Sequence, residues 1–456
     1  MGMTLAEKIL AAKAGKDQVK PGDLVDVTVD VAMSHEACAQ IEKPFEAMGA
    51  KKVWDPDKVM ITLDHWVPAS DEMSAAMHRK IRGFVDKWGL EKHFYDIGHH
   101  GICHQLLAEK GFCQPGRLVL GTDSHTNTGG ALGAFSAGVG PTEMAAIFAT
   151  GEIWLKVPQN IQVVVNGTLQ DRVYSKDIIL AAIKELSTSG ARYKAVEFRG
   201  DGVMSLPMWQ RLTLTNMTTE MGAKTGLVAA DATTYNYLET LSDPHIDYKA
   251  PDRADMEKWR SDDDAIFQET LVIDGADLEP QVAAPFSPDN VHPVSEVEGV
   301  HVDQVFIGSC TNARWEDLLI AASYFEGEKV PRGTRVIVSP ASTNIYNRAL
   351  KEGLIETFTE AGAMFLQSTC GPCFGAQGGL LDAGEVCAST SNRNFVGRMG
   401  HREGRVYLMS PATAAASAIA GEIVDPRKVN PKKVRLRGPD GATKAHSLNK
   451  LLEVAA

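Results

Sequence analysis

The sequence has no excess of basic residues and no long apolar run, and each absence excludes a class of protein. Its 456 residues include 46 Lys and Arg against 58 Asp and Glu, a formal net charge of −12. Such a chain lacks the basic surface that non-specific binding to nucleic acid or anionic membranes requires. An anionic substrate would therefore need locally placed arginines. The absence of any run of about 18 apolar residues predicts no transmembrane helix.

Cysteine is also sparse, at seven residues, and the N-terminus shows no basic-then-apolar signal layout. A small, odd number of cysteines in a long chain without an export signal predicts a reducing, cytoplasmic location. Hydrophobic residues make up 44% of the chain and charged residues 23%, values that exclude a disordered or fibrous protein. The length predicts about three domains.

Alternating strand and helix patterns predict an α/β fold, most plainly in the last third of the chain. Short apolar runs lie at 304–308, 335–338, 363–366, 385–388 and 405–409, and helical stretches lie at 315–325, 342–352 and 412–420. Alternation of this kind is typical of a parallel sheet with helices on both faces.

Two helices are expected near the N-terminus. Thr4 and Glu7 form a capping box that begins the first helix. The second spans about 71–88, where apolar residues recur at three- and four-residue steps. Such spacing predicts one buried face that includes Met73, with Ser70 as the capping residue.

Proline and strand patterns suggest where domains meet. A strand at 161–165 follows Pro158, and four prolines lie within 277–299, which predicts a linker there. The expected domains are 1–158, 159–285 and 286–456. Small residues at 129–140 lack the spacing of a dinucleotide fingerprint, and we expect them to permit close backbone packing or approach to a ligand.

Reactive side chains follow predicted strands in the last third of the chain. Cys310, Cys370 and Arg393 each come after the end of one strand. In open parallel sheets, ligands bind beyond the carboxyl ends of the strands. The sequence therefore predicts a binding or catalytic site there.

The cysteines Cys310, Cys370 and Cys373 admit several interpretations. A Cys-Gly-Pro-Cys motif suits a thioredoxin-like redox pair, but Thr369 precedes it in place of tryptophan. A zinc site needs four ligands, of which His401 could be the fourth. The cysteines could also be buried and unreactive. An iron–sulfur cluster with three thiolate ligands is favoured, and its open iron, a Lewis acid, predicts non-redox chemistry on a small hydroxy acid.

Four motifs occur together in the order of one known family. They are GTDSHT at 121–126, GSCTN at 308–312, CGPC at 370–373 and NRNFVGR at 392–398. With them the chain resembles the aconitase superfamily from about residue 20 to residue 425, and in particular the large subunits of the 3-isopropylmalate dehydratase and homoaconitase type. The resemblance implies three α/β domains with mostly parallel sheets around an iron–sulfur cluster, with the family's swivelling domain absent.

The activity that this resemblance implies is that of a hydro-lyase. It would dehydrate and rehydrate a hydroxy-dicarboxylate, with 3-isopropylmalate of leucine biosynthesis as the leading substrate. Homoaconitase, 2,3-dimethylmalate or citramalate dehydratase, maleate hydratase and aconitase activities stay open. A separate small subunit should supply the swivelling domain and its serine base, which no residue of this chain matches. An RNA-binding regulator of the same fold is a distant alternative that the acidic charge disfavours.

The resemblance also implies roles for individual residues. The ligands of a [4Fe-4S] cluster, with one iron left open, are Cys310, Cys370 and Cys373. The catalytic residues are Asp64, His65, His104, Asp123, His125 and Glu220. The substrate-binding residues are His35, Ser124, Asn216, Asn392, Arg393 and Arg398.

The chemistry of these residue types suits such roles. A carboxylate beside an imidazole fixes the tautomer and raises the basicity of the ring, which suits proton transfer at a leaving hydroxyl. Guanidinium groups bind carboxylates through two parallel hydrogen bonds. Asn216 and Glu220 are four residues apart, so a helix would place both on one face. His99 and His100 match no role in the family.

Overall fold

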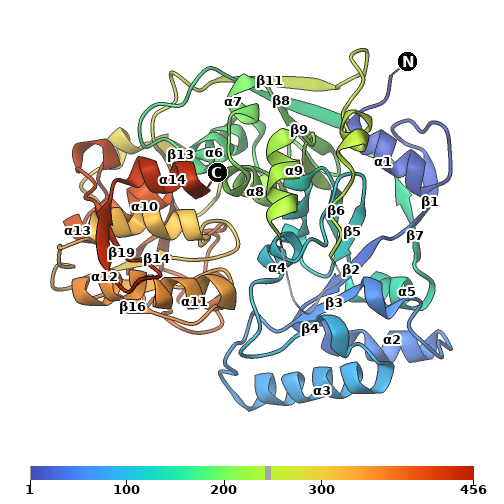
Figure 1. Cartoon of the computed structure of the whole chain (residues 1–456), viewed down its shortest axis with the longest axis horizontal. Coiled ribbons are helices and arrows are strands. Elements are labelled where there is room, and N and C mark those ends of the chain that lie inside the picture. The colour runs from blue at the N-terminus through green and yellow to red at the C-terminus, as the bar shows by residue number, and fades with distance from the viewer. Residues whose placement is uncertain (1, 242–247, 456) are drawn as a thin grey trace.

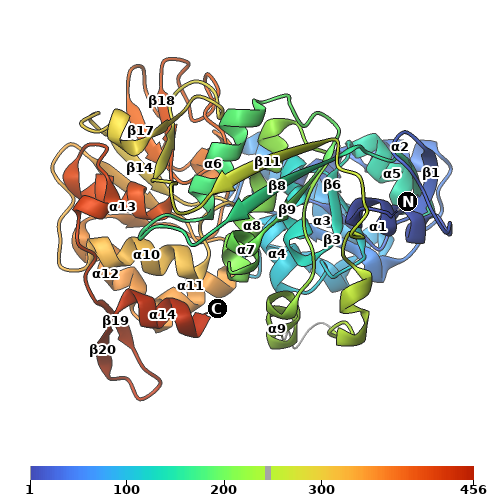
Figure 2. The same cartoon turned by 90° about the horizontal axis from the view of Figure 1, so that it is seen from above.

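Three larger sheets and two small ribbons organise residues 2–241 and 248–455, the part of the chain that this computed structural model describes. The larger sheets use residues 31–138, 160–274 and 281–408 in turn. The second sheet lies between the other two (Figures 1 and 2). The α/β fold with mostly parallel sheets is confirmed, and the expected domain boundaries near 158 and 285 stay a prediction.

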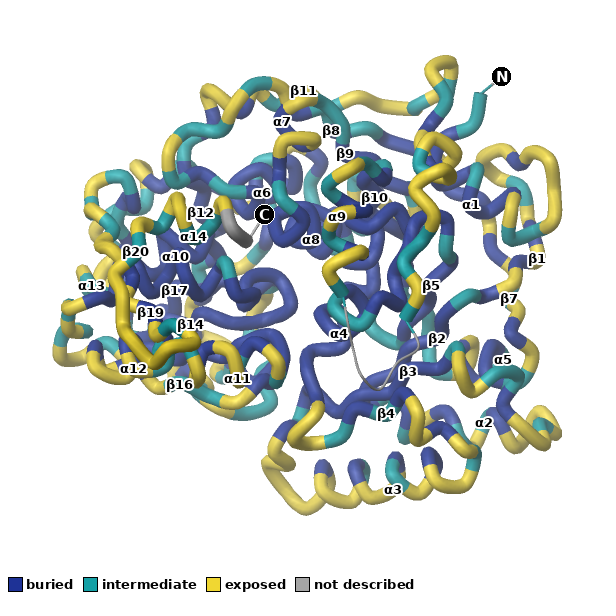
Figure 3. Tube along the Cα trace, in the orientation of Figure 1, coloured by how far each residue is buried: buried dark blue, intermediate teal, exposed yellow. Residues whose placement is uncertain are grey.

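The first sheet is parallel throughout, with strand order β4-β3-β2-β5-β6. Its strands are β2 (Val31–Ser34), β3 (Val59–Thr62), β4 (Phe94–Tyr95), β5 (Leu118–Gly121) and β6 (Phe135–Gly138). The helices of this region are α1 (Leu5–Lys13), α2 (Glu42–Ala47), α3 (Glu72–Trp88), α4 (Cys103–Glu109) and α5 (Pro141–Thr150). Strands β2, β3 and β5 are buried on both faces, as is usual for parallel sheets covered by other elements (Figure 3).

The second sheet is also parallel, with strand order β10-β9-β8-β11. Its strands are β8 (Asn160–Asn166), β9 (Ala195–Arg199), β10 (Thr225–Val228) and β11 (Glu269–Asp274). The helices between them are α6 (Ser175–Leu186), α7 (Asp201–Met204), α8 (Met208–Asn216) and α9 (Ala232–Thr240). Helix α8 packs against the turn that follows β5, so the second sheet contributes side chains to the region beyond the first.

The third sheet has the strand order β13-β12-β18-β17-β14-β15-β16. Its strands are β12 (Gln281–Ala283), β13 (Val291–Pro293), β14 (Gln304–Ile307), β15 (Arg335–Val338), β16 (Met364–Phe365), β17 (Val386–Ser389) and β18 (Arg405–Leu408). Its helices are α10 (Trp315–Phe325), α11 (Thr343–Lys351), α12 (Leu354–Ala361) and α13 (Pro411–Ala420). The five strands β14 to β18 are parallel and coincide with the predicted runs.

Two small ribbons complete the described elements. One pairs β1 (Leu24–Thr28) with β7 (Glu152–Lys156), and the other pairs β19 (Val434–Arg437) with β20 (Thr443–His446) before α14 (Leu448–Ala455). In Figure 3 the ribbon of β19 and β20 is largely exposed, as is the edge strand β11 of the second sheet, whereas most other strands of the larger sheets are buried. Within the described residues, no helix is long and apolar enough to span a membrane.

Three local expectations need correction. The segment 277–299 is not a linker, because β12 and β13 pair with each other and β12 joins the third sheet through β18. Proline is tolerated there because β13 is an edge strand. The cap of α3 is Asp71 rather than Ser70, since the Asp71 carboxylate accepts the N–H of Ser74. Met73 is 81% exposed, because the buried face of α3 begins one residue later.

The small residues at 129–140 pack closely against the second sheet, as expected. A Cβ atom added to Gly130 would lie 1.7 Å from the carbonyl oxygen of Gly226, which lies within β10. Only glycine permits this approach. The turn that carries the predicted Asp-Ser-His motif is therefore held directly against the backbone of the neighbouring sheet.

Candidate active site

The carboxyl ends of strands from the first and third sheets carry most of the predicted site residues. His35 follows β2, Asp64 and His65 follow β3, and the 123–125 motif follows β5. On the other side, Cys310 follows β14, Cys370 follows β16 and Asn392 follows β17. The two sides meet directly, because the backbone N–H of Cys370 donates to the carbonyl oxygen of Asp64 at 2.9 Å.

Asp64 and His65 form a tight pair in the loop after β3. The Nδ1 atom of His65 lies 2.6 Å from Oδ1 of Asp64, and the other oxygen of Asp64 accepts the backbone N–H of Cys103 at 2.8 Å. Burial opposes the charged imidazole, but Cys370 and Asp64 beside it hold the pKa of His65 well above its ordinary value. The pair can therefore keep a proton on a buried ring.

A second group joins two histidines to two carboxylates. His104 Nε2 lies 2.8 Å from Asp123 Oδ1, and His125 Nε2 lies 3.2 Å from Glu220 Oε2. Glu220 also accepts a hydrogen bond of 2.6 Å from Arg393 Nε. Asp123 is half-buried, and its bonds to the two imidazoles hold its pKa well below the ordinary value. His125 and Arg393 lower the pKa of Glu220 in the same way.

The three predicted cysteines are buried, with exposures of 6% for Cys310, 8% for Cys370 and 5% for Cys373. Asn216 and Asn392 each donate a side-chain N–H to the sulfur of Cys310, at 3.2 and 3.4 Å. The sulfur of Cys373 lies 3.6 Å from Oδ1 of Asn392, so this amide touches both sulfurs.

The electrostatic environment of these sulfurs differs from one cysteine to the next. Burial raises the pKa of Cys310 to about 12 and that of Cys370 well above its ordinary value. The pKa of Cys373 is lowered despite its burial, because Arg398 and Ser309 favour the thiolate. Without a bound cation, two of the three sulfurs would therefore stay protonated.

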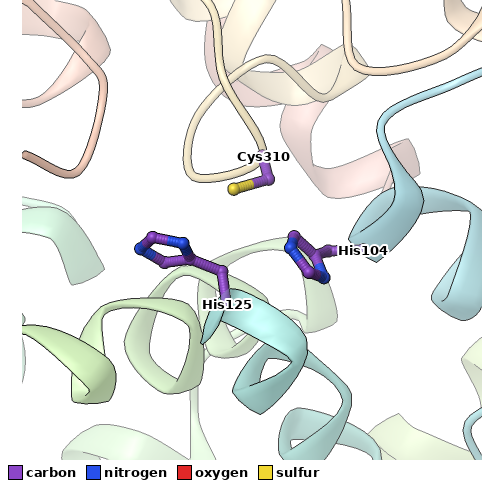
Figure 4. A group of neighbouring side chains, drawn as sticks. All are labelled: His104, His125 and Cys310. Atoms are coloured by element: carbon purple, nitrogen blue, oxygen red, sulfur yellow. The ribbon is translucent and has the colours of Figure 1, made fainter. Parts of the chain in front are cut away.

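Cys310 faces the second histidine group across the site. Figure 4 shows His104, His125 and Cys310 pointing toward one another from three different segments. One nitrogen from each ring and the sulfur all lie within 4.8 Å of one another. The imidazoles are therefore close enough to act on a ligand that is bound beside the sulfurs.

The two predicted substrate arginines differ in how they are held. Arg393 is engaged by Glu220 and also donates from Nη2 to Ser124 Oγ at 2.9 Å. Arg398 packs over the Phe374 ring, with Cζ 5.5 Å from the ring centre. Its Nε is buried and has no hydrogen-bond partner among the described residues. Arg398 thus offers a guanidinium donor that the protein itself does not use.

His35 lies against the Asp64–His65 pair. The rings of His35 and His65 stack at 4.3 Å with an interplanar angle of 21°. His35 Nε2 is 4.0 Å from Asp123 Oδ2. The structure therefore brings all fifteen predicted site residues into one connected region.

One prediction about neighbouring residues is refined, and His100 gains a structural role. Asn216 and Glu220 do not share one helix, because α8 ends at Asn216 and Glu220 lies in the following 3₁₀ turn, η5 (Met217–Met221). The change of helix type turns Asn216 toward Cys310 and Glu220 toward His125. His100 Nε2 lies 2.8 Å from the carbonyl oxygen of Ser368, so it anchors the segment before Cys370.

Two buried charged residues that hold site loops were not predicted from the sequence. Glu36, directly after His35, accepts backbone N–H groups from the loop of Asp64 and His65. Its place after a strand end and beside a candidate residue was a usable signal. Lys176 in α6 donates from Nζ to the carbonyl oxygens of Thr390 and Ser391, at 2.9 and 2.6 Å. Nothing in the local sequence distinguishes it from a surface lysine.

Comparison with known proteins identifies relatives over most of the chain. The model of the aconitase family (aconitate hydratase) matches residues 7–298 and 295–421. A protein of Methanopyrus kandleri named 3-isopropylmalate dehydratase large subunit 1 is 50% identical over 428 residues, covering 94% of this chain and 99% of the relative. A similarly named large subunit 1 of Archaeoglobus fulgidus is 48% identical over 432 residues, covering 94% of this chain and all of the relative (100%).

A third relative, from Methanothermobacter thermautotrophicus, is named probable 3-isopropylmalate dehydratase large subunit. It is 47% identical over 430 residues, covering 93% of this chain and 99% of the relative. Among solved structures, aconitase X of Thermococcus kodakaraensis in its holo form matches with a TM-score of 0.47 and 14% identity. That match covers 85% of this chain and 88% of the other.

Proposed function

The chain belongs to the aconitase family, and from that premise we propose that it is the large subunit of a [4Fe-4S] hydro-lyase. Its substrate would be a hydroxy-dicarboxylate, with 3-isopropylmalate first, because curated relatives of nearly the same length carry that name. The observation that carries the proposal is the convergence of three buried cysteines with two carboxylate–histidine groups and an unused guanidinium donor.

The donor set fits an iron–sulfur cluster. Thiolates are the usual protein ligands of cluster iron, and Cys310, Cys370 and Cys373 come from the carboxyl ends of strands in one sheet. The amides of Asn216 and Asn392 already donate to the sulfur of Cys310, and such N–H···S contacts stabilise the charge of a bound thiolate cluster. These three cysteines would hold the cluster, and its open iron would supply a Lewis acid for hydroxyl and carboxylate oxygens.

The side chains around the three cysteines are assigned the binding of substrate and the transfer of protons. We assign the binding of a substrate carboxylate to Arg398, whose Nε is free to donate. His65, whose Nδ1 is held by Asp64, is placed to donate a proton to the departing hydroxyl. His104, Asp123, His125 and Glu220 form a connected acid–base group that orients Arg393, because Glu220 binds both His125 and Arg393.

Removal of the carbon-bound proton is assigned to a partner. The family resemblance places that base on a swivelling domain, and the relatives are named as large subunits. We therefore propose a small subunit that supplies this domain and covers the site. The large subunit alone is expected to bind a cluster and to be nearly inactive.

An ultraviolet assay of alkene formation tests the proposal. The cluster would be reconstituted without oxygen, and the small subunit encoded nearest to this gene would be added. Substrates to compare are isopropylmalate, homocitrate, citrate, citramalate, dimethylmalate and malate. Preferential dehydration of isopropylmalate is expected. Preferential dehydration of another acid would replace isopropylmalate as the assigned substrate. If no acid is dehydrated although the cluster is intact, the hydro-lyase proposal is refuted for this pair of subunits.

A further inference from the structure

Glu36 lies behind the Asp64–His65 pair of the first sheet, beside His35. It begins the 3₁₀ turn η1 (Glu36–Gln40) after β2 and is 1% exposed. Its Oε1 atom accepts the backbone N–H groups of Asp64 at 3.1 Å, His65 at 3.0 Å and Trp66 at 3.1 Å. Three consecutive amides of the loop after β3 thus converge on one carboxylate oxygen.

We propose that Glu36 is a positioning residue for the proposed hydro-lyase reaction, acting through His65. This inference rests on the proposed function. The carboxylate fixes the backbone of 64–66, and the side chain of Asp64 then fixes the imidazole ring at Nδ1. The remaining nitrogen of His65 is thereby aimed into the site.

Within the part of the chain that the structure describes, these three N–H groups of the loop have no hydrogen-bond acceptor other than Oε1 of Glu36. Successive N–H groups that point to one side make a concave site for an anion. A buried N–H group that loses its acceptor is unfavourable, so removing the carboxylate would favour another backbone conformation of 64–66. His78 from α3 supports Glu36 from behind, with Nε2 3.5 Å from Oε1. The pKa of Glu36 stays well below its ordinary value despite burial, because His35 and His78 contact it.

Glu36 also faces both stacked imidazoles of the site. Its Oε2 lies 3.7 Å from Nδ1 of His35 and 3.8 Å from Nδ1 of His65. The opposite nitrogens of the two rings are 4.0 and 3.7 Å from Oδ2 of Asp123. The stacked rings therefore lie between two carboxylates, and a displacement of Glu36 would shift both of them.

Metal binding is the alternative role for this group of side chains. His35, Glu36, Asp64 and His65 offer ligand atoms within 4.8 Å of one another. One oxygen of each carboxylate already accepts N–H groups, however: Oε1 of Glu36 accepts three, and Oδ2 of Asp64 accepts that of Cys103. The other oxygen of Glu36, Oε2, has no hydrogen-bond partner among the described residues and faces the rings of His35 and His65. Oε1 of Glu36 and Oδ2 of Asp64 are thus occupied as acceptors of backbone N–H groups. This occupation favours a positioning role over metal binding.

The test compares three variants of the cluster-loaded chain with its small subunit. Glu36→Ala removes the acceptor, Glu36→Gln keeps an acceptor oxygen without the charge, and Glu42→Ala removes a half-buried glutamate of α2 that pairs with Lys87. For Glu36→Ala we expect kcat to fall by roughly 10- to 100-fold, as for other residues that orient catalytic groups, with KM within about twofold of the unchanged chain. Glu36→Gln should recover most of the loss, and Glu42→Ala should change neither constant.

Hydrogen exchange of the backbone amides at 63–67 provides a readout that does not depend on turnover. Exchange there should become faster in Glu36→Ala and stay slow in Glu36→Gln and Glu42→Ala, with the visible absorbance of the cluster retained in all three. If Glu36→Ala does not fold, Glu36→Asp takes its place. This variant has a side chain one methylene shorter, so its carboxylate lies farther from the amides of the loop.

Three outcomes would overturn the inference. They are an unchanged kcat in the variant that lacks the acceptor, a rise in KM alone, and exchange at 63–67 that stays slow. Failure of the proposed function looks different. In that case the unchanged enzyme dehydrates none of the acids tested, and the exchange measurement alone then decides whether Glu36 holds the loop.

Discussion

Substitution of Arg398 by lysine should weaken substrate binding while leaving the free protein almost unaffected. The guanidinium packs on Phe374, and its Nε has no partner among the described residues. Arginine can grip a carboxylate with two parallel hydrogen bonds, whereas lysine binds it as a single point charge. Losing one charge-assisted hydrogen bond costs about 1.5–3 kcal/mol, which corresponds to an increase in KM of about 10- to 150-fold.

Arg393 provides the matched comparison because the protein already uses its side chain. Its hydrogen bonds to Glu220 and Ser124 are 2.6 and 2.9 Å long, and the Glu220 side chain is fully buried. Arg393→Met therefore leaves a buried carboxylate without one of its two cationic partners, which costs about 3 kcal/mol of folding free energy. Arg398→Lys breaks no internal hydrogen bond that the structure shows, so we expect a change below about 0.5 kcal/mol.

The assay measures KM with the reconstituted two-subunit enzyme and chemical unfolding with the cluster-free chain. The expected result is a large KM effect without destabilisation for Arg398→Lys, and destabilisation for Arg393→Met. Equal destabilisation by both substitutions would show that Arg398 is anchored inside the protein. An unchanged KM in Arg398→Lys would remove that residue from the substrate site.

Three further predictions concern the cluster, pH and packing. Cys310→Ser should abolish the visible absorbance of the reconstituted cluster. Cys387→Ser, which replaces a buried cysteine in β17, should retain it. Equal absorbance of the two variants would reject Cys310 as a ligand. Burial raises the pKa of Glu316 from 4.5 to about 7, so the folded chain binds the proton of this carboxyl group more tightly than the unfolded chain does. The free energy of unfolding therefore falls as the pH rises from about 4.5 to about 7. Glu316→Gln should therefore raise the unfolding free energy by about 1–3 kcal/mol at pH 8 and by little at pH 5; an equal gain at both would contradict this origin. Gly130→Ala should cost about 3 kcal/mol or more, because the new methyl would lie 1.7 Å from the Gly226 oxygen; calorimetry that shows an unchanged Tm would disprove the close packing.

Local sequence signals predicted those features that depend on neighbouring residues. The capping box of Thr4 and Glu7, the strands at 304–307 and 335–338, and helix α10 occur where the patterns placed them. Capping, apolar periodicity and turn residues act within a few positions, so they can be recognised without a tertiary structure. The α/β class follows from the same signals, because alternating strands and helices can bury their apolar faces in few ways.

The motifs of the site were also visible in the sequence, but the hydrogen bonds between their residues were not. The resemblance named Asp64 and His65, yet it gave no indication that Glu36 binds three amides of their loop. Met73 failed as a core prediction because helical periodicity does not say where a buried face begins.

The sequence by itself determined the fold class, the family and the residue types of the site, because these reside in short motifs and in local periodicity. The tertiary structure decided which of those residues touch. It joined Glu220 to both His125 and Arg393, left Nε of Arg398 free to donate, and placed Lys176 under the loop of 390–391. Such contacts join residues far apart in the chain, 269 positions in the case of Ser124 and Arg393, and they bring three sheets together. Contacts of that range depend on how whole sheets pack, which no local pattern in the chain encodes.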